Sequence, residues 1–325
     1  MLISVLNACT IHYLQRSIRD PNCMKQNTDS KFDFREKSLE IAFRLLKYAT
    51  RLKFSSLMKF GRFLGRRVMQ LNPEQTRIAA INIDTCFPIL SPQQNRELLA
   101  EHFENVGMGL IEMGISWWMP DETFRKLIHV KGLENLETAF KKGKGVILAT
   151  GRFTTPDILS RCLGKLVKVT EIYVPSREPL VDEKTRFHRS KQVQNILMHE
   201  NLKQITDALK QNQAVLFTHD MPIEHKQFTF ANFFNIPAAT NTAISRFARM
   251  TEAEVIPVTV LRRENHEGYN LIFESPLTGF PGNNAELDTQ RLNLVIERWV
   301  DTVSYTHLTL PTNIIRCGSR WWPVP

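Results

Sequence analysis

The sequence predicts an α/β fold: a mixed, mainly parallel sheet flanked by helices, with a basic amphipathic helical region at the N-terminus. From residue 145 onward, short apolar runs that suit buried strands alternate with segments of helical periodicity, a pattern typical of layered α/β domains. The preceding part of the chain shows mainly helical periodicity, so we expect it to flank the sheet. With 325 residues, of which 42% are hydrophobic, the chain is large enough for a sizeable core.

Most of the positive charge lies in one segment near the N-terminus. Residues 31–69 hold eleven Lys or Arg and three acidic residues, in a chain of formal net charge +9. Apolar positions such as Leu39, Phe43 and Leu46 recur at helical spacing, which predicts a basic amphipathic helix over residues 39–70. Such a helix suits an anionic membrane interface, a solvated helix packed on the domain, or a nucleic-acid groove. No base-stacking motif accompanies the charge, so we expect no nucleic-acid partner.

Both ends of the chain are expected to lie outside the folded domain. Residues 1–38 are predicted either to be disordered or to include residues upstream of the true start, which would then be Met24. They lack the pattern of a signal peptide. No apolar run reaches the ~18 residues that span a bilayer. Residues 303–312 resemble a translated sequencing-library adapter, so residues 303–325 are predicted to be a non-native tail. The α/β domain is then 71–302.

Strands and helices are predicted in alternation within that domain. The run from Val146 to Ala149 is apolar on both faces, which is typical of a buried strand in a parallel sheet. The last two strands are expected to form an antiparallel edge. The predicted strands are 145–150, 168–174, 214–218, 254–261 and 269–274, and the predicted helices are 158–163, 183–195, 202–211, 242–250 and 287–300.

A short polar loop follows the first predicted strand and carries Arg152 and Asp157, five positions apart. Parallel sheets bind ligands at the carboxyl ends of their strands, so we expect the chemistry here. A His at position 152 would form a familiar pair, in which the carboxylate orients an imidazole that accepts a proton. Arg152 cannot accept a proton, because a guanidinium stays protonated in proteins.

This loop resembles that of the late lipid A biosynthesis acyltransferases of Gram-negative bacteria. The family signature is a His and an acidic residue with four residues between them, Phe-Thr among these; here the motif ends in FTTPD and Arg152 takes the His place. The resemblance covers about residues 41–301. The other matching pieces are NIDTCFP from Asn82, GMGLIEMGISWW from Gly107, YVP from Tyr173, EPLVD from Glu178 and FTHD from Phe217.

The resemblance implies an acyltransferase-like fold and transfer of a fatty acyl chain. The donor would be an acyl carrier protein thioester, and the acceptor a hydroxyl of a Kdo-bearing lipid A precursor at the cytoplasmic face of the inner membrane. In the implied mechanism the His deprotonates the hydroxyl, Asp157 orients the His, and backbone or Arg donors stabilise the oxyanion. No metal or bound cofactor is required.

Arg152 predicts a chain whose acyl transfer is impaired, with a salt bridge from Arg152 to Asp157 that occupies the carboxylate. Two alternatives stay open. One is a catalytically inactive relative that binds the lipid A precursor or the carrier protein, and the other is a basic peripheral membrane-binding module that uses only the N-terminal segment.

Three further residues are expected to meet this pair at the strand ends. Arg189 falls where the family has a functional Arg, which would bind an acceptor phosphate or an oxyanion; the alternative is a surface cation. Asp220 ends a predicted strand, as site residues often do, although capping or loop Asp residues occupy such places too. Thr154 is a candidate donor or a local turn residue. Phe153 and Tyr173 are expected to be packing residues.

The cysteines point away from metal and disulfide chemistry. Five are scattered along the chain, without metal-ligand spacing or a disulfide framework. We expect a reducing, cytosolic environment. No Gly-rich phosphate loop is present either, so nucleotide chemistry is not expected.

Overall fold

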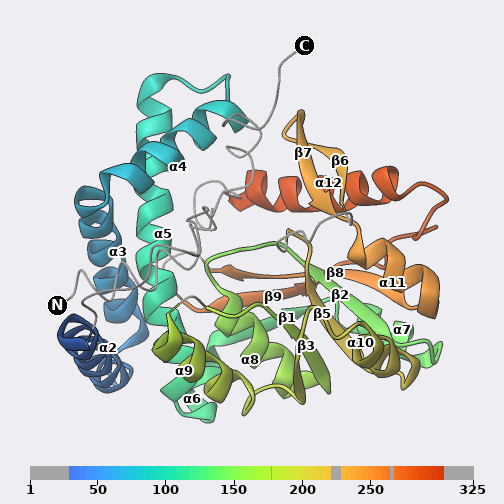
Figure 1. The fold of residues 1–325 in the computed structure, drawn as a ribbon, viewed down its shortest axis with the longest axis horizontal. Helices are drawn as coiled ribbons and strands as arrows, with labels where there is room; N and C mark the ends of the chain where they lie inside the picture. The colour runs from blue at the N-terminus through green and yellow to red at the C-terminus, as the bar shows by residue number, and fades with distance from the viewer. Residues whose placement is uncertain (1–28, 177, 221–227, 264–266, 304–325) are drawn as a thin grey trace.

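The computed structural model describes residues 29–176, 178–220, 228–263 and 267–303. In these ranges a seven-stranded sheet has the order β1-β9-β8-β2-β5-β3-β4, and β6 and β7 form a separate antiparallel hairpin (Figure 1). Within the large sheet every neighbouring pair is parallel except β8–β9, which confirms the predicted mixed, mainly parallel sheet. The strands are β1 (Ile128–Lys131), β2 (Val146–Thr150), β3 (Val169–Tyr173), β4 (Asn195–Met198), β5 (Ala214–Thr218), β6 (Phe228–Phe233), β7 (Ile236–Asn241), β8 (Glu254–Arg262) and β9 (Tyr269–Phe273).

Two sheet predictions need correction. The antiparallel pair β8–β9 forms, but it is not an edge, because β1 adds to β9 in parallel. The helix predicted over 183–195 ends at Arg189, and the chain then turns into β4, which pairs with β3. The hairpin strands β6 and β7 were not predicted, nor were β1 and β4 of the large sheet, which have four residues each and are partly exposed. Neither β1 nor β4 contains the apolar run of four to eight residues from which a buried strand is predicted.

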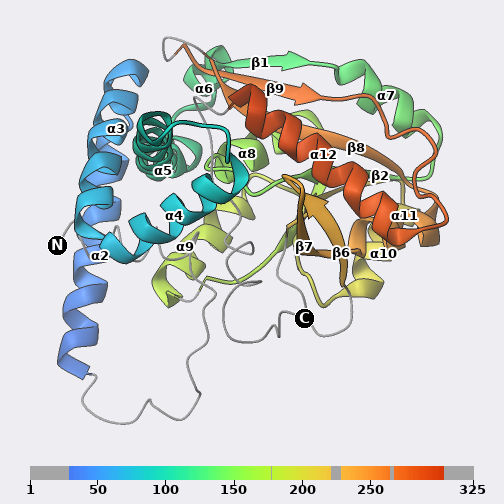
Figure 2. The same cartoon turned by 90° about the horizontal axis from the view of Figure 1, so that it is seen from above.

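Helices cover both faces of the sheet (Figure 2). Along β2, Val146 and Leu148 belong to one core with α5, α7 and α8, whereas Ile147 and Ala149 belong to another with α10, α11 and α12. This alternation is what a strand buried on both faces requires. The helices are α2 (Asp29–Ala49), α3 (Phe54–Leu71), α4 (Pro73–Cys86), α5 (Pro92–Trp118), α6 (Asp121–Leu127), α7 (Leu133–Lys141), α8 (Pro156–Leu166), α9 (Pro179–Arg189), α10 (Leu202–Lys210), α11 (Ala243–Thr251) and α12 (Ala285–Val303).

The N-terminal basic segment forms two helices rather than the predicted single helix over 39–70. The chain breaks between α2 and α3, where Thr50 Oγ1 donates to the Lys47 carbonyl at 2.7 Å and Lys53 takes an extended conformation. Helix α2 begins at Asp29, so part of the segment predicted to be disordered is helical. Residues 1–28 and 304–325 lie outside the described ranges. None of the described helices is long and apolar enough to cross a membrane.

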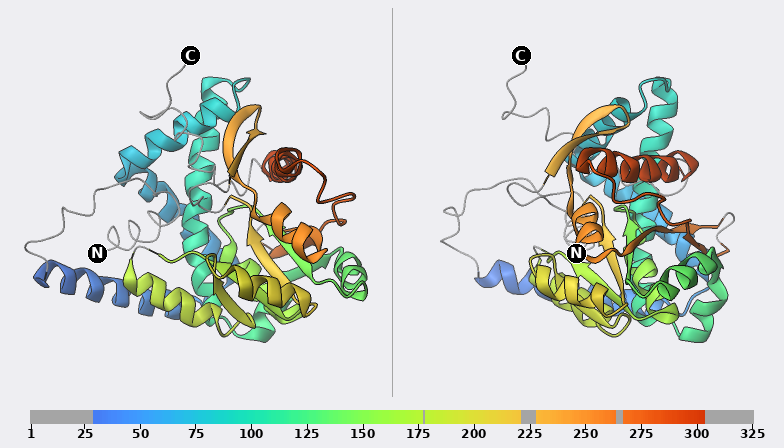
Figure 3. Two further views of the ribbon diagram at one scale, coloured as in Figure 1. Left: turned by 45° about the vertical axis from the view of Figure 1, so that its right-hand side comes forward. Right: turned by 90° about the vertical axis from the view of Figure 1, so that its right-hand side faces the viewer.

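Helix α5 joins the N-terminal helices to the sheet (Figure 3). It starts with a capping box in which Ser91 and Gln94 satisfy each other's backbone N–H groups. It packs closely against α3 because glycines lie at the crossing. A Cβ on Gly65 would lie 1.9 Å from the Phe103 carbonyl oxygen, and one on Gly107 would lie 2.2 Å from the Gly61 carbonyl oxygen. The other end of α5 reaches the site described next.

Candidate active site at the ends of strands β2 and β5

Neighbouring parallel strands bring Arg152 and Asp220 together. Thr150, the last residue of β2, is in register with Thr218, the last residue of β5, so the loops that follow them start side by side. The His219 backbone N–H donates to the Thr150 carbonyl at 2.7 Å. Arg152 Nη2 donates to the Asp220 carbonyl at 3.4 Å, and Arg152 Nε lies 3.7 Å from Asp220 Oδ2. The Arg152 side chain thus bridges the two strand ends.

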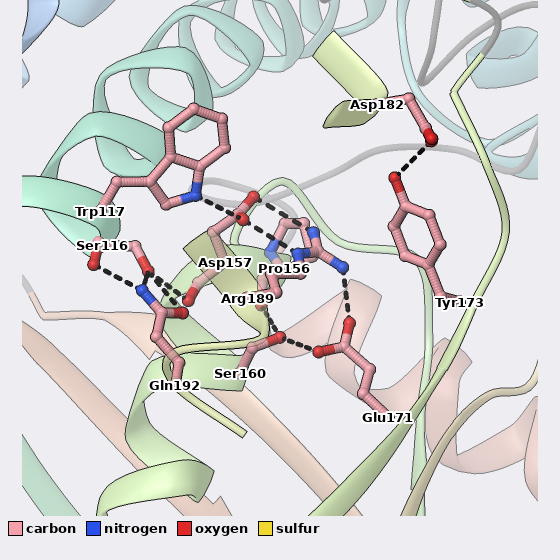
Figure 4. Close-up of polar contacts among 10 residues, drawn as sticks. All are labelled: Ser116, Trp117, Pro156, Asp157, Ser160, Glu171, Tyr173, Asp182, Arg189 and Gln192. Atoms are coloured by element: carbon pink, nitrogen blue, oxygen red, sulfur yellow. Dashed lines mark hydrogen bonds and ion pairs between the residues drawn. The ribbon is translucent and has the colours of Figure 1, made fainter. Parts of the chain in front are cut away.

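Asp157 lies in the first turn of α8, where the helix dipole favours a negative charge. Its side chain is only 8% exposed. Arg189 donates to both oxygens, from Nε to Oδ1 at 3.0 Å and from Nη2 to Oδ2 at 3.2 Å (Figure 4). Trp117 Nε1 also donates to Oδ1, at 3.2 Å. Three donors therefore orient this carboxylate and favour its negative charge.

The salt bridge predicted between Arg152 and Asp157 is wrong. Within the described residues, the carboxylate of Asp157 is bound by Arg189 and Trp117, and Arg152 pairs with Asp220 instead. The reason is geometric. Arg152 leaves β2 beside β5, whereas α9 ends with Arg189 next to the first turn of α8.

A second buried carboxylate, Glu171 of β3, binds the other side of the same arginine. Arg189 Nη1 donates to Glu171 Oε1 at 2.5 Å, and Ser160 Oγ donates to Glu171 Oε2 at 2.7 Å. The side chain of Arg189 is 11% exposed, so it is not the surface cation of the alternative prediction. A role of Arg189 in binding an acceptor phosphate or an oxyanion stays a prediction.

The end of α5 is tied to the site through backbone groups. Ser116 Oγ donates to the backbone carbonyl of Asp157 at 2.7 Å, and Gln192 Nε2 donates to the Ser116 carbonyl at 2.7 Å. Sequence analysis singled out neither Trp117 nor Glu171. Glu171 did carry a signal, because a charged residue inside a predicted buried strand needs a partner. Trp117 lies in the matching stretch from Gly107, but a tryptophan in an apolar helix is usually a core residue, so the stretch gave no reason to choose it.

His188 adds an aromatic layer above Trp117. The two rings stack with centroids 4.6 Å apart and planes 7° apart. Burial and the charge of Lys191 lower the pKa of His188 to about 4, so its imidazole is neutral near pH 7. A neutral ring therefore covers the indole that binds the Asp157 carboxylate.

Thr154 anchors the loop to the scaffold. Its Oγ1 accepts from Arg262 Nη2 at 3.0 Å, deep in the protein. Arg262 also donates from Nε and Nη2 to the two oxygens of Glu112, each at 2.6 Å, and the Tyr269 hydroxyl donates to Glu112 at 2.9 Å. This network fixes the loop against α5, β8 and β9. The contact of Thr154 with Arg262 joins residues 108 positions apart in the chain, so it tests neither the local turn role nor the donor role of Thr154, and both stay predictions.

Two titratable groups follow β5. Burial raises the pKa of Asp220, although the Arg152 guanidinium opposes the shift. Burial lowers the pKa of His219 to about 4, and its Nε2 lies 3.1 Å from Asn293 Oδ1 of α12. His219 is thus a core residue that joins the strand end to α12.

The fold and this site define an α/β enzyme with a buried carboxylate at the carboxyl end of a central strand. The model of the bacterial lipid A biosynthesis acyltransferase family matches residues 38–307. Because this match spans most of the chain, the chain belongs to that family. It is an acyltransferase of lipid A biosynthesis, as its resemblance predicted.

Curated relatives agree with this assignment. The chain is 28% identical over 250 residues to the lipid A biosynthesis lauroyltransferase of Escherichia coli K12, covering 77% of this chain and 82% of that protein. It is 28% identical over 248 residues to the palmitoleoyltransferase of the same organism, covering 76% and 81%. A lipid A biosynthesis acyltransferase of Haemophilus influenzae is 25% identical over 232 residues, with 71% and 74% covered.

Among solved structures, the 1-acyl-sn-glycerophosphate acyltransferase of Thermotoga maritima matches with a TM-score of 0.36 and 13% identity. The match covers 76% of this chain and 95% of that one.

Proposed function

We propose that the chain transfers a fatty acyl group from an acyl carrier protein thioester to a hydroxyl of a Kdo-bearing lipid A precursor, at the cytoplasmic face of the inner membrane. We further propose that the transfer is slow, because Arg152 replaces the base. One observation carries the proposal: Asp157 is buried, oriented by three donors and placed five residues after position 152, where the family has its acidic residue.

The Asp157 carboxylate is oriented as it would be to bind an imidazole at position 152, where this chain has Arg152. In the proposed reaction, a His at position 152 takes the proton from the acceptor hydroxyl, and the hydroxyl oxygen attacks the thioester carbonyl carbon. The tetrahedral intermediate then collapses: the C–S bond breaks and the imidazolium returns its proton to the departing sulfur, so the carrier leaves as a thiol and the base is regenerated. Asp157 orients the imidazole and stabilises its positive charge.

Arg152 cannot perform the first step. Its guanidinium keeps its protons at physiological pH and is paired with Asp220 across the strand ends. Loss of a general base costs about 10²–10⁴-fold in rate. The rest of the site does not depend on residue 152, because the contacts of Asp157 come from Arg189 and Trp117.

The surface of α2 and α3 supports the proposed membrane contact. Exposed apolar residues follow this segment: Ile41, Leu45 and Tyr48 on α2, Leu52 in the turn after it, and Phe60 and Phe63 on α3. Residues 41–73 contain eight Lys or Arg and no acidic residue. Exposed apolar side chains among basic ones match the chemistry of an anionic bilayer interface.

A second candidate is an inactive relative that binds the lipid A precursor or the carrier protein without transfer. The ion pair between Arg152 and Asp220 favours it, since this pair joins two strand ends at which substrate is expected. Tight binding without turnover would distinguish this candidate from a slow enzyme.

The deciding experiment measures acyl transfer from an acyl carrier protein thioester to a tetra-acylated Kdo-bearing precursor. We expect Arg152→His to raise the rate by about 10² or more relative to the unaltered chain. Arg152→Gln is the matched control: it removes the charge and the ion pair but supplies no base, so its rate should stay near that of the unaltered chain.

Two outcomes would count against the proposal. Equal gains in Arg152→His and Arg152→Gln would show that the cation blocks the site and that no base at position 152 is needed. No activity in any chain, with all of them folded by circular dichroism, would favour the binding-only relative.

A further inference from the structure

Arg189 is shared between two buried carboxylates from different elements. One edge of its planar guanidinium, Nε and Nη2, faces Asp157 of α8, and Nη1 faces Glu171 of β3 (Figure 4). A guanidinium is planar and rigid, so a hydrogen bond made by the N–H groups on one side fixes the direction in which the N–H groups on the other side point. The position of Glu171 therefore determines how Arg189 presents its donors to Asp157.

Glu171 is itself held firmly. It lies within β3, in register with Leu216 of the neighbouring β5, and its second oxygen accepts from Ser160. Its side chain is 6% exposed. We propose that Glu171 is a positioning residue for acyl transfer, which acts on Asp157 through Arg189. This inference rests on the proposed function, because Asp157 matters only if it orients the base.

Trp117 supports Asp157 from the opposite side. Its indole donates to Oδ1, the oxygen that also accepts from Arg189 Nε. The carboxylate is thus held between α5 on one side and the Arg189–Glu171 pair on the other. Loss of either support lets the carboxylate turn away from position 152.

Glu171 also contributes to the net charge of the cluster around Arg189. Asp157 and Glu171 with one arginine leave one net negative charge in a buried place. His188 from α9 and Tyr173 from β3 also face the cluster; burial lowers the pKa of His188 and raises that of Tyr173, so neither is charged near pH 7. Replacement of Glu171 by Gln therefore removes the excess negative charge while it keeps the size of the side chain.

The kinetic test uses the Arg152→His chain as the active background. We expect Glu171→Gln and Trp117→Phe each to lower kcat by about tenfold while KM changes by about twofold at most. A positioning residue acts on the chemical step rather than on substrate binding. Trp117→Phe keeps an aromatic ring beside His188 and removes the indole N–H donor.

The matched control is Glu104→Gln on the same helix as Trp117. Glu104 is buried and also bound by arginines, with Arg62 Nε at 2.6 Å and Arg66 Nε at 2.5 Å. It lies 13 residues before Trp117 along α5, about 20 Å away at the rise of an α-helix. We expect Glu104→Gln to lower Tm and to leave kcat unchanged.

A second readout needs no turnover. In the unaltered chain, the indole ¹H–¹⁵N resonance of Trp117, identified by its loss in Trp117→Phe, should shift in Glu171→Gln and stay in place in Glu104→Gln. The proposal is overturned if that resonance does not move in Glu171→Gln, or if Glu104→Gln lowers kcat as much as Glu171→Gln. An inactive Arg152→His chain would overturn the proposed function, and the indole comparison would still decide the positioning role.

Discussion

Position 152 and Asp157 have separate structural supports. Asp157 is bound by Arg189 and Trp117, and Arg152 binds Asp220. A change at residue 152 therefore leaves the carboxylate in place. This independence is why a single substitution is expected to restore activity, since the partner of the missing base is already oriented.

His219 should make stability depend on pH. Its pKa is lowered from 6.5 to about 4 by burial, so the folded chain binds fewer protons than the unfolded chain between these values. Stability is then fully present above about pH 6.5 and is lost as pH falls toward 4. We expect the free energy of unfolding to drop by about 3 kcal/mol over this interval because of His219.

Urea unfolding of His219→Gln from pH 7 to pH 4 checks this expectation. The variant lacks the titrating ring, so its loss of stability on acidification should be smaller by a similar amount. His129→Gln, on the exposed face of β1, is the control and should keep the slope of the unaltered chain. Identical slopes in all three proteins would contradict the burial argument.

Helix α5 connects the basic N-terminal helices with the loop that carries Arg152 and Thr154. Its glycines allow close packing at two places, against α3 at Gly107 and against the loop at Gly109, where an added Cβ would lie 2.6 Å from the Thr154 carbonyl oxygen. The small residues in this helix thus bring the elements of the site together.

Gly65→Ala should destabilise the protein despite the better helix propensity of alanine. The new methyl group would lie 1.9 Å from the Phe103 carbonyl oxygen, so α3 and α5 must move apart. We expect a loss of about 1–3 kcal/mol, measured as a lower Tm and a lower urea midpoint. Ser55→Ala, at an exposed position of the same helix, is the control; an equal effect in both variants would contradict the packing argument.

The distribution of charge and exposed apolar groups suits the membrane contact that we propose. Helices α2 and α3 carry the exposed apolar residues, while α5 extends from them to the site. Two cations lie over exposed aromatic rings, Arg51 over Tyr48 at 5.5 Å and Arg67 over Phe63 at 5.2 Å. This pairing of aromatic and basic groups suits the headgroup region of an anionic membrane.

Vesicle co-sedimentation tests this surface. Leu45→Ser/Tyr48→Ser on α2 and Phe60→Ser/Phe63→Ser on α3 should each weaken binding to phosphatidylglycerol vesicles by about tenfold or more, because each removes two apolar groups that enter the interface. Ile89→Ser is the control, since Ile89 is 96% exposed but lies in the turn between α4 and α5. An equal effect of Ile89→Ser, or binding that is insensitive to salt, would contradict an oriented anionic contact.

Much of the fold was predictable because its central strands are continuous apolar runs. Strands β2, β5 and β8 are buried on both faces and were predicted within one or two residues. The short strands β1 and β4 were missed because they are partly exposed. The prediction of a single N-terminal helix is wrong, because residues 50–53, where the helix breaks, contain no Pro or Gly that would indicate a break.

The sequence by itself determined the family, the α/β class, and the loop that carries Arg152 and Asp157, because these follow from local patterns and motif order. Only the tertiary structure decided which residues bind the carboxylate. Arg189 and Trp117 are 32 and 40 positions from Asp157, and Glu171 joins them from a third element. Contacts over such separations depend on how α5, β3, α8 and α9 pack together, and no local pattern in the chain records that packing.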